Sequence, residues 1–264
     1  WPANLHLIGK DILRFHTIYW PIILMALDLP LPEQVFGHPW LLMGNDKMSK
    51  SKGNVIYADD LVEKFGVDAV RYYLLHEIPY SSDGNITYEL LIERINGDLA
   101  NVLGNLVQRT ISMANKYFDR KVSNKKVYEE IDKPFIQAMN DLTAQVESKM
   151  KNLEIADSIS LIFDVLRSSN KYIDETTPWV LSKDLSKQDR LETVIYCLLE
   201  AIRICALKLA PFLPDTSEEI LRQLNLHDST EQFCDDHIYQ LNEPKVLFAR
   251  IDKDKFMEEI HCQS

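Results

Sequence analysis

Three lysines lie within six residues of one another, in a segment rich in small side chains. The segment reads Lys47-Met48-Ser49-Lys50-Ser51, and Lys52-Gly53-Asn54 follows it. Because glycine and small residues leave a loop free to rearrange, several ammonium groups can converge on one anion. Preorganised cationic donors stabilise the charge that develops on a polyphosphate in a transition state. The other interpretation is a solvated basic loop, which is the more common case for a generic lysine and serine cluster.

A second candidate site lies at a strand-to-helix turn near the start of the chain. Gly9-Lys10-Asp11 follows the apolar run Leu5–Ile8. A glycine at the end of a strand lets a ligand approach the backbone, and a carboxylate at the start of the next helix can hold ribose hydroxyls. Ile12, His16 and Trp20 recur every four residues and share one helix face. That face is either a ligand pocket or an ordinary core face with one hydrogen-bonded histidine.

A third set of residues could recognise RNA. Asn101, Asn105 and Arg109 are spaced by four, so they form a polar stripe on one helix face. Thr177-Pro178 separates two helical stretches and places Trp179 at a helix start. Proteins read single-stranded RNA by stacking bases on aromatic rings and by hydrogen bonds to base edges. A solvated helix face and a tryptophan anchored in the core are the alternative interpretations.

The elements that position these residues change in type along the chain. Up to about residue 60 the pattern is typical of an α/β segment, with strands expected over 5–8, 35–43 and 55–57. A helix is expected over 11–27, closed by Asp28, Pro30 and Pro32. Gly44-Asn45 is a turn pattern. A complete doubly wound sheet has about twice as many strands, so this segment is the edge of one.

From Asp59 onward the sequence predicts helices almost throughout. Gly66 is the expected stop of the first helix, Thr87 opens a long pattern, and Thr216–Glu219 is an expected capping box for a last helix. The remaining helices are expected over 134–150, 155–174 and 190–209. An apolar stripe is expected to face the core and comprises Leu99, Val102, Leu103, Leu106, Thr110 and Met113. Together they predict a helical bundle of roughly 165 residues.

Composition excludes several classes of protein. The chain has 264 residues, of which 46% are hydrophobic and 26% charged, which excludes a disordered chain. The longest uncharged apolar run, Ile18–Leu27, is about half of what a membrane span requires. No signal peptide is evident. The four cysteines have neither CxxC nor zinc-site spacing, which indicates a reducing compartment and a cytoplasmic location; they are Cys197, Cys205, Cys234 and Cys262.

The net charge of −11 argues weakly against a nucleic-acid partner, because phosphates attract lysine and arginine. That total conceals an uneven distribution. Residues 97–126 carry six basic and two acidic groups, next to the polar stripe. The acidic total therefore leaves RNA binding open.

The three candidate sites together resemble a known family. Residues 47–51 spell KMSKS, the second signature of the class I aminoacyl-tRNA synthetases. Three other segments resemble methionyl-tRNA synthetases specifically: Ile8–Pro21, Leu99–Arg109 and Pro178-Trp179. The second of them contains the Asn-x-x-x-Arg pair. The resemblance extends to about Arg250. It implies the α/β edge of a Rossmann-type catalytic domain followed by a mainly α-helical anticodon-binding bundle.

The resemblance also implies domain boundaries and residue roles. The end of the catalytic domain would span 1–36, the KMSKS loop and stem-contact region 37–97, and the anticodon-binding domain 98–264. Lys47 and Lys50 would be catalytic, stabilising pyrophosphate. The implied ATP-binding residues are Gly9, Asp11, Lys47, Ser49, Lys50 and Ser51. The implied methionine-binding residues are Ile12, His16 and Trp20, and those that would read the CAU anticodon are Asn105, Arg109 and Trp179.

The implied reaction is the ATP-dependent ligation of methionine to tRNA(Met) through a methionyl-adenylate. ATP would bring Mg²⁺, and no covalent nucleophile is required because positioning and charge stabilisation can carry the activation step. No metal ligand is assigned in this chain. The family's zinc-binding knuckle precedes this part of the enzyme, so a zinc requirement stays open.

One departure from the family is important. The first class I signature, of the type His-Ile-Gly-His, is absent, and His6-Leu7-Ile8-Gly9 is not one. We therefore expect this chain to be the C-terminal part of an enzyme, incomplete for catalysis, with the N-terminal half of the same enzyme as a partner. Two alternatives are a class I synthetase for another amino acid, such as leucine or cysteine, and a non-catalytic tRNA-binding module.

Overall fold

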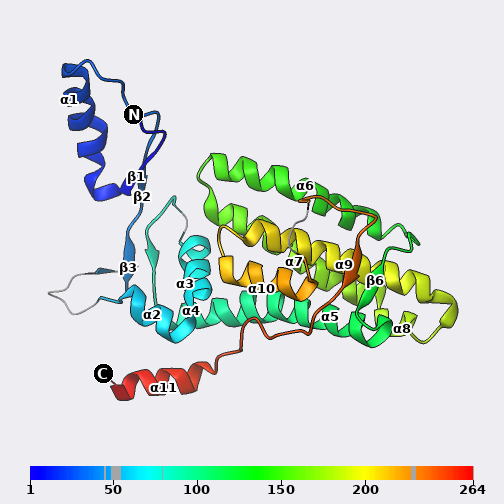
Figure 1. Cartoon of the computed structure of the whole chain (residues 1–264). Coiled ribbons are helices and arrows are strands. Elements are labelled where there is room, and N and C mark those ends of the chain that lie inside the picture. Colours follow the sequence, from blue (N-terminus) through cyan, green and yellow to red (C-terminus); the bar gives the residue numbers. More distant parts are fainter. Residues whose placement is uncertain (45, 49–54, 79, 227–229, 264) are drawn as a thin grey trace.

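The computed structural model describes residues 1–44, 46–48, 55–78, 80–226 and 230–263. A small α/β segment is followed by a large helical bundle (Figure 1). The strands are β1 (His6–Gly9), β2 (Val35–His38), β3 (Leu41–Met43), β4 (Asp46–Lys47), β5 (Gly84–Asn85), β6 (Lys121–Ser123) and β7 (Ile238–Gln240).

The helical segments are of three kinds. The α-helices are α1 (Trp20–Ala26), α2 (Ala58–Phe65), α3 (Val67–Tyr72), α4 (Tyr88–Arg94), α5 (Asn105–Phe118), α6 (Asp132–Lys151), α7 (Ile155–Thr176), α8 (Pro178–Leu181), α9 (Gln188–Leu209), α10 (Pro214–Leu224) and α11 (Lys253–Gln263). The 3-10 turns are η1 (Lys10–Ile12) and η6 (Leu185–Lys187), and the π-helices are η2 (Phe15–Tyr19), η4 (Tyr73–Glu77) and η5 (Ile95–Gly104).

The first sheet is a parallel pair with a helical crossover. β1 pairs with β2 in parallel, from His6 opposite Val35 to Gly9 opposite His38. Parallel strands need a long crossover connection between them, which here is helical. The crossover was expected as one helix over 11–27, and it is instead η1, η2 and α1 in succession. Pro21 has no N–H to donate, and at the end of the π-helix the Trp20 N–H bonds the carbonyl of Phe15, five residues back. Such π segments are frequent at functional sites.

A second sheet has the order β4-β3-β5. β3 and β4 are antiparallel around Gly44, whose φ of 59° is the left-handed conformation that a glycine adopts without strain. β5 joins β3 in parallel. The strand expected over 55–57 is wrong, because these residues lead directly into α2 and the described part of the chain offers them no partner strand. β-propensity forms a strand only where a neighbour packs against it.

The bundle packs around α9, which is buried on nearly all sides by α5, α6, α7 and α10. The buried charged side chains of α9 are paired, as Arg203 is with Glu200 at 2.6 Å. The expected core stripe is confirmed: Leu99, Leu103, Leu106 and Thr110 are fully buried. Val102 and Met113 are partly buried against the same core.

The capping box expected at Thr216–Glu219 is wrong. α10 begins earlier, at Pro214, since proline suits the first turn of a helix. Thr216 instead donates from both its backbone N–H and its hydroxyl to the Asp68 carboxylate of α3, each at 2.6 Å. α10 is also not the last helix, because α11 follows it and packs on α4.

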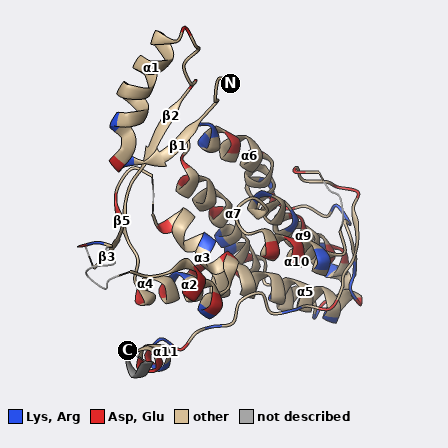
Figure 2. Cartoon of the chain, turned by 60° about the vertical axis from the view of Figure 1, so that its left-hand side comes forward, with Lys and Arg blue, Asp and Glu red and all other residues tan. Residues whose placement is uncertain are grey.

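The surface of the α/β segment differs from that of the bundle. Charged residues are distributed over the helices of the bundle, whereas α1, β1 and β2 contain none (Figure 2). Ile18, Ile22 and Met25 lie at helical spacing and are 49%, 54% and 60% exposed. Along the described residues, none of the helices is long and apolar enough to cross a membrane.

Candidate functional site

The strand-to-helix turn brings a carboxylate over a glycine. Gly9 ends β1 and Asp11 lies in η1 directly after it. A Cβ on Gly9 would lie 2.6 Å from Asp11 Oδ1, so a larger residue there would displace the Asp11 carboxylate from this position. Asp11 is exposed at the carboxyl end of a parallel strand. At this edge of a parallel sheet, nucleotide-binding folds hold their ligands.

An aromatic pocket of about 360 Å³ lies beside this turn. Its lining comprises Trp1, His6, Phe15, His16, Tyr19, Trp20 and Ile23. Two of the residues expected to bind methionine, His16 and Trp20, are in the lining. The third, Ile12, is 40% exposed and is not among the residues that line the pocket.

Two pairs of rings in the pocket meet edge to face. The His6 and His16 rings are 5.9 Å apart at 89°, and those of Trp1 and Trp20 are 6.0 Å apart at 81°. His16 Nδ1 lies 3.1 Å from the carbonyl oxygen of Ile12. Since a carbonyl only accepts, Nδ1–H is the donor in this contact. Trp1 and His6 also line the pocket and were not predicted to do so. For His6, the available indication was its position in β1, three residues before Gly9.

The lysine-rich segment is described only at its start. Lys47 ends β4 opposite Leu42, and Met48 packs against the core. Lys47 Nζ lies 4.3 Å from the centre of the Trp40 ring. Trp40 belongs to none of the three candidate sites described from the sequence. Ser49, Lys50 and Ser51, which were expected to bind ATP, lie outside the described residues.

The polar stripe runs across the junction of η5 and α5. Asn101 and Asn105 are exposed, and Arg109 is partly buried. Arg109 Nη2 lies 3.8 Å from Asp174 Oδ1, near the end of α7. This ion pair joins the stripe to the helix end that precedes Trp179.

Trp179 is held by a special backbone conformation. Thr177, the residue directly after α7, has a φ of 44°, which is unusual for a β-branched residue. Pro178 is buried at the start of α8, whereas the Trp179 side chain is 42% exposed. Strained backbone of this kind is concentrated at functional sites. A ring this exposed is available for stacking on a ligand.

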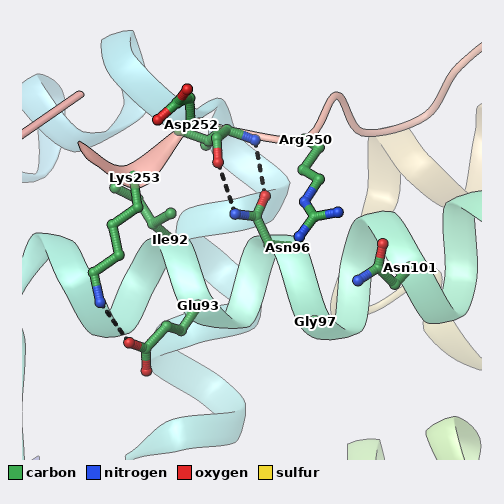
Figure 3. Close-up of a pocket in the computed structure, with 9 residues that line it drawn as sticks. Ile92, Glu93, Asn96, Gly97, Asn101, Arg250, Asp252 and Lys253 are labelled. Atoms are coloured by element: carbon green, nitrogen blue, oxygen red, sulfur yellow. Dashed lines mark hydrogen bonds and ion pairs between the residues drawn. The ribbon is translucent and has the colours of Figure 1, made fainter. Parts of the chain in front are cut away.

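A groove of about 690 Å³ lies along η5 next to Asn101 (Figure 3). Residues 250–253 form its other wall. Asn96 donates to the Ile251 carbonyl and accepts from the Ile251 N–H, both at 2.8 Å. Lys253 Nζ donates to Glu93 at 2.6 Å. These contacts hold residues 251–253 against α4 and η5, so the groove is a structural seam.

The basic segment over 97–126 is partly neutralised by its neighbours. Arg120 pairs with Glu243 at 2.7 Å, Lys125 with Glu192 at 3.6 Å, and Lys126 with Asp236 at 3.0 Å. The net positive charge at this surface is therefore smaller than the count of basic residues in the segment indicates. Within the described ranges, no cluster of His, Cys, Asp or Glu could hold a metal ion.

Comparisons with known proteins cover both parts of the chain. Residues 2–111 match the family model of class I tRNA synthetases (M), and residues 122–261 match that of the anticodon-binding domain of methionyl tRNA ligase. The chain is 52% identical over 266 residues to a methionine–tRNA ligase of Clostridium acetobutylicum and 48% identical over 263 residues to that of Bacillus subtilis. These alignments cover 99% and 97% of this chain but only 41% and 40% of those proteins.

A solved structure, Mycobacterium tuberculosis methionyl-tRNA synthetase in complex with methionyl-adenylate, superposes with a TM-score of 0.89 at 37% identity. The superposition covers 95% of this chain and 50% of that chain. The chain thus spans about half the length, or less, of the proteins it matches.

Proposed function

The chain belongs to the methionyl-tRNA synthetase family of class I aminoacyl-tRNA synthetases, and from this membership we propose that it supplies part of the machinery that ligates methionine to tRNA(Met). Because the chain covers 41% of its C. acetobutylicum relative, the activity is proposed for an enzyme that contains it. The N-terminal half of such an enzyme is the proposed partner of the α/β segment. A cytoplasmic location is proposed with it.

The observation that carries the proposal is the aromatic pocket beside the Gly9 turn. His16 and Trp20 would contact the methionine side chain, and Ile12 would support the same helix face. A thioether packs favourably against aromatic rings. Because an apolar pocket separates near-isosteres by only about 1–3 kcal/mol, the aromatic walls must also supply shape.

ATP, as its magnesium complex, is proposed to bind between the Gly9 turn and the KMSKS segment. Gly9 and Asp11 would hold adenosine, and Lys47, Ser49, Lys50 and Ser51 would hold the phosphates. A methionine carboxylate oxygen attacks the α-phosphorus, and the bond from that phosphorus to the bridging oxygen breaks to release pyrophosphate. Lys50, assisted by Lys47, would stabilise the charge on the leaving group.

Transfer to tRNA requires recognition of the anticodon. Asn105 and Arg109 are proposed to hydrogen-bond base edges, and the exposed ring of Trp179 to stack on a base of the CAU anticodon. The ion pair of Arg109 with Asp174 supports this assignment, because it ties the stripe to the helix end before Trp179.

The test is methionine-dependent exchange of pyrophosphate into ATP. We would replace the matched part of the C. acetobutylicum enzyme with this chain and assay both this hybrid enzyme and the chain alone. We expect exchange from the hybrid with methionine and not with leucine or cysteine. A hybrid that binds tRNA(Met) without exchange would favour the tRNA-binding module, and exchange with another amino acid would favour a different specificity.

A further inference from the structure

Trp40 connects two segments that are far apart in the sequence. It lies between β2 and β3, and two ammonium groups approach its ring. Lys10 Nζ, from the strand-to-helix turn, and Lys47 Nζ, from the start of the KMSKS segment, each lie 4.3 Å from the ring centre. Both distances are within the range of an attractive contact between a cation and an aromatic face.

Asp83 fixes this arrangement from a third segment. Its carboxylate accepts from Lys10 Nζ at 2.5 and 2.7 Å and from the Trp40 backbone N–H at 2.8 Å. The next residue, Gly84, donates its N–H to the Trp40 carbonyl at 3.1 Å. The hydrogen bond from Lys10, and to a smaller extent that from the Trp40 N–H, holds the pKa of Asp83 below its ordinary value. The carboxylate therefore stays charged and offsets the charge of Lys10.

The Trp40 side chain is not oriented by a hydrogen bond. Its indole N–H is buried and has no partner in the described part of the chain. The contacts that remain to orient the ring are packing and the two cations. The π system of the ring attracts both ammonium groups, and Asp83 offsets the charge of Lys10, so the two lysines can approach one ring.

We propose that Trp40 is a positioning residue, whose ring holds the ammonium group of Lys47 beside the Gly9–Asp11 turn. This inference rests on the proposed function, in which that turn binds adenosine and Lys47 assists the leaving pyrophosphate. Lys10 lies between Gly9 and Asp11 in sequence, so the ring that it contacts is anchored at the nucleotide end of the sheet. Preorganising Lys47 there lowers the barrier to adenylate formation, because less reorganisation is needed when charge develops.

The experiment substitutes Trp40 in the hybrid enzyme. Trp40→Phe should lower kcat for pyrophosphate exchange by about 2- to 3-fold, because a phenyl ring attracts a cation less strongly than an indole does. Trp40→Leu, which has no ring, should lower it by about 3- to 10-fold. The KM for methionine and the unfolding temperature should stay unchanged. Tyr57→Leu, which removes an exposed ring of the same part of the chain, is the matched control and should have no effect.

The decisive measurement is a double-mutant cycle with Lys47→Met. If Trp40 acts through Lys47, Trp40→Leu should have almost no further effect in the Lys47→Met enzyme. Additive losses would overturn the inference. Should Trp40→Leu fail to fold, tetrafluorotryptophan placed at position 40 alone keeps the shape and removes the negative ring face, and an unchanged kcat would then overturn it. A wild-type hybrid without exchange counts against the proposed function instead.

Discussion

At the residue scale, Lys50 is the sharpest test of the KMSKS segment. Lys50→Ala in the hybrid enzyme should lower the rate of pyrophosphate exchange by about 10²–10³-fold, as the loss of one preorganised donor does. Methionine binding should change little, because the pocket lies on another segment. Lys64→Ala, an exposed lysine on α2, is the control of equal charge. Exchange kinetics that match the wild type would remove Lys50 from the mechanism.

Trp179 separates tRNA recognition from amino acid activation. Trp179→Ala should weaken tRNA charging by about 1–3 kcal/mol, the usual value of one base stack, while pyrophosphate exchange survives. Trp179→Phe keeps a ring and should recover most of the loss. If Trp179→Ala lowers charging and exchange together, the side chain supports the fold and does not contact RNA.

Single site residues were predictable from the sequence where they belong to a local motif. They were not predictable where they are brought together only by the fold. The spacing of His16 and Trp20 predicted one shared helix face, and both line one pocket in the structure. The roles of these residues in binding methionine and of Trp179 in binding RNA stay predictions. Trp40 belongs to no motif, and its meaning depends on Lys10 and Lys47, which are 37 residues apart along the chain. No local pattern carries such a relation.

At the element scale, α6 and α9 are joined by a buried ion pair. Asp132 is fully buried and accepts from Arg190 at 2.6 and 2.9 Å and from the Tyr172 hydroxyl at 2.6 Å. Asp132→Ala should cost about 3–5 kcal/mol of unfolding free energy, because it leaves a buried guanidinium without its main partner.

The matched control for this pair is on the same helix. Lys133→Ala removes a pair with Glu130 whose side chains are 69% and 88% exposed. That change should stay within about 0.5 kcal/mol. Denaturant titration of both variants measures the difference, and equal losses would show that the Asp132 pair is no more important than a surface pair.

His76 makes the junction between η4 and α7 sensitive to pH. Its ring stacks on Tyr72 at 5.0 Å and lies 3.2 Å from the Ser160 hydroxyl, and burial lowers its pKa despite the opposing charges of Asp98 and Glu77. The unfolded chain therefore takes up a proton at a higher pH than the folded chain does. Stability should fall as the pH drops below the ordinary histidine value of about 6.5.

The measurement is the unfolding temperature between pH 7.5 and 5.5. His76→Phe keeps the stacking and removes the proton, so it should flatten the loss. Part of the slope should remain, because burial also lowers the pKa of His237. An identical slope in both proteins would assign the pH dependence elsewhere.

Helices were largely predictable because apolar periodicity is local, and their ends were less so. α7 and α9 lie within two residues of their expected bounds. In α10, the side chain of Thr216 bonds Asp68, which lies 148 residues earlier in the chain, and not the backbone of its own helix end. The strand expected over 55–57 needed a partner that the sequence pattern alone could not supply.

At the scale of the whole molecule, the exposed apolar face of α1 should be covered in the larger enzyme. Met25→Glu, at a position 60% exposed here, should leave the stability of the isolated chain nearly unchanged. In the hybrid enzyme it should lower the unfolding temperature by about 5 °C or more, because it buries an unpaired charge. Leu185→Glu, at a position 87% exposed on the bundle, should be neutral in both. Equal behaviour of the two variants in the hybrid would mean that this face stays open.

The seam that closes on α11 determines the order in which the chain can finish folding. Asn96 and Ile251 bond across 155 residues of sequence, and the Phe256 ring lies 5.0 Å from Phe65 and 5.9 Å from Tyr88. During synthesis, α2 and α4 therefore emerge long before the segment that covers them. Since the entropy of closing a loop grows only with the logarithm of its length, this separation costs little stability. It costs time, because α2 and α4 stay uncovered until the segment that carries Phe256 has been synthesised.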